Sequence, residues 1–257
     1  MNVAGLADPT LFYALAVLGV LLAGFSKASA AGGVGMLAVP LMSIAIAPQH
    51  AAAIMLPLLC ALDLLGLWAY RGHSDFKLLR QLVPGAIVGV AIGALVFKTL
   101  DVRWVKALLG IECLVFAVHR LVGARRFDRL PGARQSRVQA AFWSMVSGFT
   151  STLAHAGGPP LLQYLLPLKL DKMYMVATTV YFFTVVNYVK LVPYAWLDLL
   201  DRSNLGTSLM LVPVVPLGYW IGLTFTRRIP EKPFYTFVNW SLVATGAKLL
   251  WDGIFPG

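Results

Sequence analysis

The feature that most constrains this chain is a series of apolar stretches, each about as long as a helix that crosses a bilayer. A helix needs about 20 apolar residues to span a hydrocarbon core of about 30 Å. We expect such spans at residues 51–70, 82–97, 104–121, 173–194, 205–225 and 234–250. Backbone groups in lipid must be paired within the protein, and these stretches do not alternate in polarity, so helices fit better than a barrel. The sequence therefore predicts an all-α polytopic membrane protein.

Composition supports this class. Of the 257 residues, 59% are hydrophobic and 12% are charged, whereas a soluble domain carries about 25% charged residues. The formal net charge of +10 would suggest a nucleic-acid partner in a soluble protein. Here the cations lie mainly between the apolar stretches, so we interpret them as topology signals and expect a lipid bilayer, and no nucleic acid, around the chain.

The largest group of cations lies near the middle of the chain and divides it into halves. Its members are Arg120, Arg125, Arg126, Arg129, Arg134 and Arg137. The positive-inside rule places this linker in the cytoplasm, and we expect the chain to lie in the inner (cytoplasmic) membrane of the cell. We therefore expect a first transmembrane repeat at residues 1–122, an Arg-rich cytoplasmic linker at 123–137 and a second transmembrane repeat at 138–257.

Internal similarity indicates that the halves are homologous. The segment GFSKASAAGGVGMLAVPL from Gly24 is matched by GFTSTLAHAGGPPLLQYLLPL from Gly148. Further along, PGAIVGVAIG from residue 84 is answered by PVVPLGYWIG from residue 213, and Asp63 aligns with Asn187. Internal symmetry of this kind is typical of secondary transporters, whose sites lie where the repeats meet.

Each half also carries a broken apolar helix, at residues 10–25 and 138–154, followed by a Gly-Gly pair and a shorter apolar piece. If each broken segment is a hairpin, the cationic loops after residues 71, 169 and 227 fall inside and the acidic loop at 198–201 falls outside. If each broken segment were instead a single crossing, the loops after residues 169 and 227 would fall outside and the acidic loop would fall inside. Each half then has one hairpin and three spanning helices, which places the two repeats in inverted orientations and both termini outside the cytoplasm.

The two breaks predict an anion site. Unwound backbone at membrane depth is tolerated only where it is buried in protein or lines a cavity, and Gly32-Gly33 and Gly157-Gly158 are such segments. We expect a short helix after each pair, beginning at about residue 34 and at residue 159 or 160. Two helix N-termini that meet would present N–H donors and positive dipole ends to an anion. Close helix packing by small residues is the alternative.

Several polar side chains lie beside the breaks or within the spans. Lys27, Ser29 and His155 flank the breaks, and packing alone does not explain them. Asp63 lies near the middle of its span, where it is either a proton-coupling group or a structural partner of Lys27. The further candidates for hydrogen bonds to an oxyanion are Thr178, Thr179 and Asn187. Bonding of the threonine hydroxyls to their own helix is the alternative.

Three more charged residues receive structural interpretations. Glu112 lies within a span, where we expect it to be a partner of His119 or Lys190. Lys190 and Lys248 lie near the ends of their spans, and their ammonium groups could snorkel to the membrane surface.

The paired pattern resembles the sulfite exporter TauE/SafE family of membrane permeases over nearly the whole chain. Its parts, each present twice, are an apolar helix, a Gly-Gly break, a following proline, a span, a cationic loop and a Pro/Gly-rich span. The resemblance implies a secondary transporter of small sulfur-containing anions such as sulfite, sulfoacetate and other organosulfonates. Protons are a candidate coupling ion and a homodimer is a candidate assembly.

The residues also bear on other functions. An anion channel stays open as an alternative. A membrane-embedded enzyme would need a nucleophile with a base or a metal set, and the chain has neither HExxH nor GxSxG. A thiol relay would need an exchanging pair, but Cys60 and Cys113 fall in different spans and are interpreted as core residues. We therefore expect no catalytic residue, no metal and no cofactor.

Overall fold

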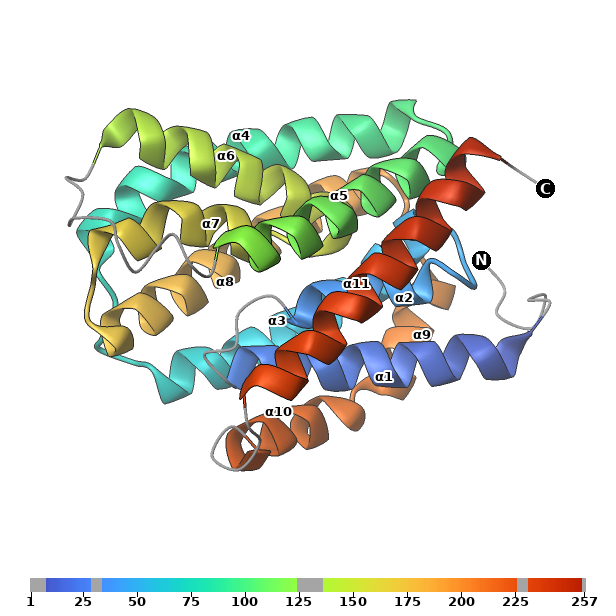
Figure 1. Ribbon diagram of the computed structural model, residues 1–257, viewed down its shortest axis with the longest axis horizontal. Coiled ribbons are helices and arrows are strands. Elements are labelled where there is room, and N and C mark those ends of the chain that lie inside the picture. Colours follow the sequence, from blue (N-terminus) through green and yellow to red (C-terminus); the bar gives the residue numbers. More distant parts are fainter. Residues whose placement is uncertain (1–7, 29–33, 124–135, 226–230, 256–257) are drawn as a thin grey trace.

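The computed structural model describes residues 8–28, 34–123, 136–225 and 231–255 (Figure 1). The first half contains α1 (Pro9–Ala28), the 3-10 helix η2 (Val34–Leu37), α2 (Ala38–Met42), α3 (Pro48–Ala69), α4 (Phe76–Thr99) and α5 (Val102–Gly123). The second half contains α6 (Arg137–Ala154), α7 (Gly158–Leu165), η4 (Leu166–Leu168), α8 (Lys172–Trp196), α9 (Arg202–Leu211), α10 (Val214–Phe225) and α11 (Glu231–Ile254). These ranges hold no β-strand, so the all-α prediction is confirmed.

Several helices have the length and composition of membrane spans. Among the described residues these are α1, α3, α4 and α8, and α9 with α10 makes a fifth if the bent pair is counted as one span. Large apolar side chains also face outward, such as Trp68 and Val192, which are 72% and 74% exposed. A surface of this kind suits lipid better than water. The chain is therefore a multi-pass membrane protein, and crossings by α5 and α11 stay predictions.

One expected span is interrupted. The sequence predicts a continuous helix over residues 205–225, whereas α9 ends at Leu211 and α10 begins at Val214 with a bend of 43°. Pro213 lies at this break. Proline has no backbone N–H and its ring collides with the preceding turn, which explains why the helix does not continue.

Three helix pairs lie side by side with very close backbones: α4 with α6, α1 with α10, and α5 with α11 (Figure 1). A Cβ atom built on Gly89 of α4 would lie 1.9 Å from the carbonyl oxygen of Met145 on α6. One built on Gly24 of α1 would lie 2.8 Å from the backbone of Gly218 on α10, and one on Gly110 of α5 would lie 2.6 Å from the backbone of α11. Small residues permit such contacts, as they commonly do between membrane helices.

The helices α3 and α8 pack against each other, and α3 also contacts α1, α2, α6 and α9. Between Ala51 and Leu62 most side chains of α3 are fully buried. The buried polar residues include Asp63 on α3 and both Asn187 and Lys190 on α8. A polar cluster therefore lies inside an apolar core, which is costly unless its members satisfy one another.

Candidate functional site

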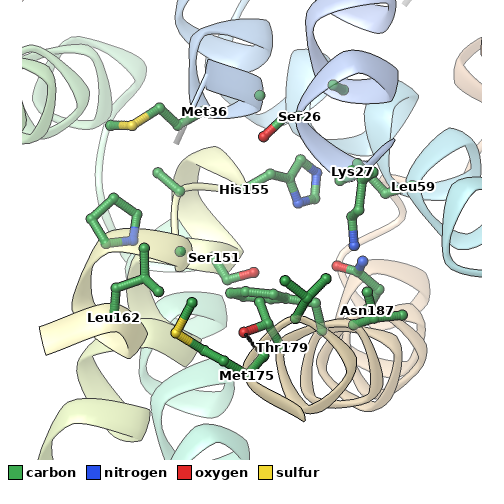
Figure 2. Close-up of a pocket in the computed structure, with 18 residues that line it drawn as sticks. Ser26, Lys27, Met36, Leu59, Ser151, His155, Leu162, Met175, Thr179 and Asn187 are labelled. Atoms are coloured by element: carbon green, nitrogen blue, oxygen red, sulfur yellow. Dashed lines mark hydrogen bonds between the residues drawn. The ribbon is translucent and has the colours of Figure 1, made fainter. Parts of the chain in front are cut away.

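Polar side chains from α1, α6 and α8 converge on a cavity of about 150 Å³ (Figure 2). The polar residues that line it are Ser26, Lys27, Ser151, His155, Thr179 and Asn187. Most of the remaining wall is apolar and includes Met36, Leu59, Leu162, Met175 and Phe183. An apolar cavity with a few converging polar groups is typical of a site for a small ligand.

An ion pair closes one side of the cavity. Lys27, in the last turn of α1, donates to Oδ1 of the fully buried Asp63 on α3. The second carboxylate oxygen, Oδ2, accepts from Nδ2 of Asn187 at 2.6 Å. Both oxygens of this carboxylate therefore accept hydrogen bonds. The pairing of Asp63 with Lys27 is thus confirmed, whereas a role of Asp63 in proton coupling stays a prediction.

Lys27 keeps contact with the cavity. Its side chain is 18% exposed, while that of Asp63 is 0% exposed. Its ammonium nitrogen also lies 5.5 Å from the centre of the Phe183 ring, within the range of a cation–π contact. The lysine therefore presents a positive charge to the cavity even while it is paired.

A second cluster surrounds Lys190, which is fully buried. Its ammonium donates to the carbonyl oxygen of Ser151 at 3.0 Å and to Oγ of the same residue at 3.1 Å, and it lies 2.7 Å from Nδ1 of His155. Nε2 of His155 lies 2.9 Å from the carbonyl oxygen of Ala52. A carbonyl oxygen only accepts, so Nε2 carries the imidazole proton and Nδ1 accepts from the ammonium.

This arrangement corrects two expectations. Lys190 does not snorkel, because its donors are satisfied inside the protein, and it does not pair with Glu112. Oε1 of Glu112 is buried and has no hydrogen-bond partner in the part of the chain that the structure describes, which does not include the side chain of His119. Lys248 is 51% exposed and pairs with Asp252 one turn along α11 at 2.9 Å.

The two glycines of the second break have different surroundings. A Cβ atom on Gly157 would lie 2.5 Å from the carbonyl oxygen of Ser147, whose hydroxyl donates to the carbonyl oxygen of Gly157 at 2.6 Å. Gly158 lines the cavity, and a Cβ atom there would meet nothing within 4 Å. Close packing therefore explains Gly157, and the cavity explains Gly158.

The helix after this break offers fewer N–H donors than expected. His155 ends α6 with a left-handed backbone (φ 53°), and α7 begins at Gly158, one residue before the expected start. Pro159 and Pro160 follow, and proline has no N–H. The backbone donors at this end of α7 are therefore those of the Gly157-Gly158 pair.

The first break is described only at its edges. Ser29, Gly32 and Gly33 lie outside the described residues. The described chain continues with η2 at Val34, and Gly35 and Met36 line the cavity.

The two adjacent threonines of α8 point in different directions. Thr179 lines the cavity, but its hydroxyl donates to the carbonyl oxygen of Met175 at 2.8 Å, the bonding within the helix that was the alternative. Thr178 is fully buried outside the cavity wall, and its hydroxyl accepts from the backbone N–H of Asp75 at 3.2 Å. The structure thus brings Lys27, His155 and Asn187 together and leaves Thr178 apart.

Sequence reasoning missed Ser151 and Lys190 as parts of this site. The alignment of the repeats carried a signal for the first, because matching Gly24 with Gly148 places Ser151 opposite Lys27. For Lys190 the signal was its spacing of three residues from Asn187, which puts both on one face of a helix. No group of three His, Cys, Asp or Glu side chains that could hold a metal occurs among the described residues.

Comparison with known proteins gives a match to one protein family. A family model described as "Sulfite exporter TauE/SafE" matches residues 16–249. That range includes both breaks and all the residues that line the cavity. No curated protein and no solved structure gives a significant match.

Proposed function

The chain belongs to the TauE/SafE sulfite exporter family of membrane transporters, and from that membership we propose that it is a secondary transporter (permease) of small sulfur-containing anions. Sulfite and organosulfonates are the proposed substrates, and the cytoplasmic membrane is the proposed location. The observation that carries the proposal is the cavity, in which the ammonium of Lys27 faces an otherwise largely apolar wall. A positive charge at membrane depth favours a bound anion.

The shape of the cavity supports a carrier rather than a channel. On α8 its lining runs from Met175, near the start of the helix, to Asn187 in the middle. Further along the same helix, Lys190 and Tyr194 are fully buried in the core. A channel needs a continuous path, whereas a carrier exposes its site to one side at a time.

We propose that the halves are inverted repeats. The helix order of the first half recurs in the second if α9 with α10 is the counterpart of α4. The contacts between the halves follow the same correspondence. Helix α4 of the first half packs against α6 of the second, and α10 of the second half packs against α1 of the first. A twofold axis between the halves would produce these contacts and would bring α3 and α8 together.

The ion pair suggests how protons could be coupled to the anion. An anion bound to Lys27 would compete with Asp63 for the same ammonium. The released carboxylate would be left with the single hydrogen bond from Asn187, and an unpaired buried carboxylate is costly. Uptake of a proton by Asp63 would relieve that cost, so protons are the proposed coupling ion.

Transport assays in proteoliposomes test the proposed function. We expect the flux of sulfite or an organosulfonate to saturate with concentration and to show counterflow when unlabelled anion is trapped inside. Flux without saturation or counterflow would indicate a channel. No flux for any member of a panel of sulfite, sulfate, sulfoacetate and alkanesulfonates would overturn the proposed substrate class.

The inverted arrangement predicts that both termini lie outside the cytoplasm. Figure 1 shows the first turn of α1 and the last turn of α11 at one end of the molecule, and the start of α8 at the opposite end. A reporter that works only in the cytoplasm should be silent when fused after Gly257. The same reporter should be active when inserted at residues 125–137. Strong activity at the C-terminus would contradict the inversion.

The second break provides a matched pair of substitutions. Gly158→Val should weaken anion binding and transport, because the new side chain enters open space in the cavity, and the folded protein should keep its thermal stability. Gly157→Val should instead lower the free energy of unfolding by about 1–3 kcal/mol or more, because its side chain meets the backbone of α6. Flux and melting temperature, measured on both variants, check the prediction. Normal transport by Gly158→Val would place the anion elsewhere.

A further inference from the structure

We propose that the cavity holds an amphipathic anion: a sulfonate with a short apolar tail, whose head lies beside Lys27 and whose tail lies between Leu162 and Met175. The inference rests on the proposed function, because it names which of the sulfur-containing anions the same cavity would favour. Its basis is the separation of polar from apolar side chains along the cavity. A compact inorganic anion such as sulfite would contact only one part of this wall.

The polar end of the cavity contains Lys27 and Asn187, which Figure 2 shows on the same side. Lys27 donates to Asp63, yet its side chain stays 18% exposed, so its ammonium remains within reach of a ligand. The side-chain amide of Asn187 has two N–H donors, and Oδ2 of Asp63 accepts one of them. This end therefore suits the oxygens of a sulfonate head.

The opposite end of the cavity is apolar. Figure 2 shows Met36, Leu162 and Met175 on the side away from Lys27. Thr179 also lines the cavity, but its hydroxyl donates to the carbonyl oxygen of Met175 at 2.8 Å. Its hydrogen is thus already used within α8. This end offers a ligand apolar contact area.

The two ends are far apart for an inorganic anion. On α8 the lining runs from Met175 to Asn187, and these twelve positions correspond to about 18 Å along a helix. Val180 and Phe183 line the cavity between them and are apolar as well. Sulfite bound at Lys27 would leave water against the apolar side chains. A tail on the anion would displace this poorly bonded water, and such displacement raises affinity.

The side chains at the apolar end also limit the kind of tail. Methionine is unbranched and flexible, so Met36 and Met175 can adapt to tails of different length. A charged group is treated differently. An ammonium or a carboxylate placed between Leu162 and Met175 would lose hydration against apolar neighbours, which is costly. The cavity should therefore prefer simple alkanesulfonates to sulfonates that end in a second charge.

The test measures the dissociation constants of methane-, ethane-, propane- and butanesulfonate with the purified full-length protein. Each added methylene should tighten binding by about two- to fourfold until the apolar end is filled. Taurine has as many non-hydrogen chain atoms as propanesulfonate but ends in an ammonium, so it should bind about tenfold more weakly or worse. Equal constants along the series, or equal constants for taurine and propanesulfonate, overturn the inference.

Substitutions at the apolar end test where the tail lies. Met175→Gln and Leu162→Asn each put an amide of similar size on the wall. In both variants the ratio of the methanesulfonate constant to the propanesulfonate constant should fall toward one, because the tail gains less there. A merely structural role would change both constants by the same factor. If one variant does not fold, the other carries the test.

Met173→Gln is the matched control. Met173 lies on the same helix as Met175, is 47% exposed and is outside the cavity lining, so this variant should keep the ratio of the wild type. An unchanged ratio in a folded Met175→Gln or Leu162→Asn protein overturns the placement of the tail. Transport of sulfite without any gain from a tail overturns this inference and leaves the proposed function standing. A wild type that neither binds nor transports any sulfur-containing anion overturns both.

Discussion

Lys27→Met is expected to lower the free energy of unfolding by about 3–5 kcal/mol, the usual cost of breaking a buried ion pair. The substitution leaves Asp63 as a fully buried carboxylate with one hydrogen bond, from Asn187. Asp63→Asn should cost less, because the lysine left behind is 18% exposed and faces the cavity. The double variant should be more stable than Lys27→Met alone, since it removes both charges.

Thermal or denaturant unfolding of the four proteins in detergent measures this cycle. The pair of Lys248 and Asp252 is the control, because it joins the same two residue types at 2.9 Å on an exposed face. Its single variants should change stability by no more than about 0.5 kcal/mol. If Lys27→Met and Lys248→Met have equal effects, the buried pair is not a determinant of the fold.

The affinity of the same four proteins for a sulfur oxyanion is a second measurement. Asp63→Asn removes the intramolecular competitor for the ammonium of Lys27, so a sulfur oxyanion should bind more tightly to this variant than to the wild type. Lys27→Met should bind it more weakly by roughly ten- to a hundredfold, the loss of one charge-assisted hydrogen bond. Equal affinities in all four proteins would remove Lys27 from the site.

Gly89→Ala is the second substitution with a large expected effect. Its methyl group would lie 1.9 Å from the carbonyl oxygen of Met145, and this neighbour is backbone that cannot rotate away. Helices α4 and α6 would have to separate, so we expect a loss at or above the upper end of the usual 1–3 kcal/mol for overpacking.

The matched control for this substitution is Gly206→Ala, inside α9. A Cβ atom at Gly206 would meet nothing within 4 Å, so alanine should be neutral there or raise stability by up to about 1 kcal/mol through its higher helix propensity. Melting temperatures of the two variants check the prediction. A stable Gly89→Ala protein would mean that α4 and α6 do not need their close contact.

The amino-acid sequence by itself determined the helical class and pointed to several of the residues that line the cavity. Long apolar stretches leave only helices as a way to pair the backbone in lipid. The alignment of Asp63 with Asn187 brought together two residues that do contact, at 2.6 Å. Whether Asp63 is a structural partner of Lys27 was not settled at that level, because the sequence of one helix does not show which neighbour faces each position.

Only the tertiary structure decided which face of each helix looks into the cavity. Thr178 and Thr179 are neighbours in the sequence, but successive helical residues point about 100° apart, and the rotation of α8 sends only Thr179 to the cavity wall. Lys190 looks like a residue near a span end, yet packing of α8 against α6 buries it beside Ser151. Such outcomes depend on contacts between residues far apart in the chain, which hydropathy and spacing along one helix do not encode.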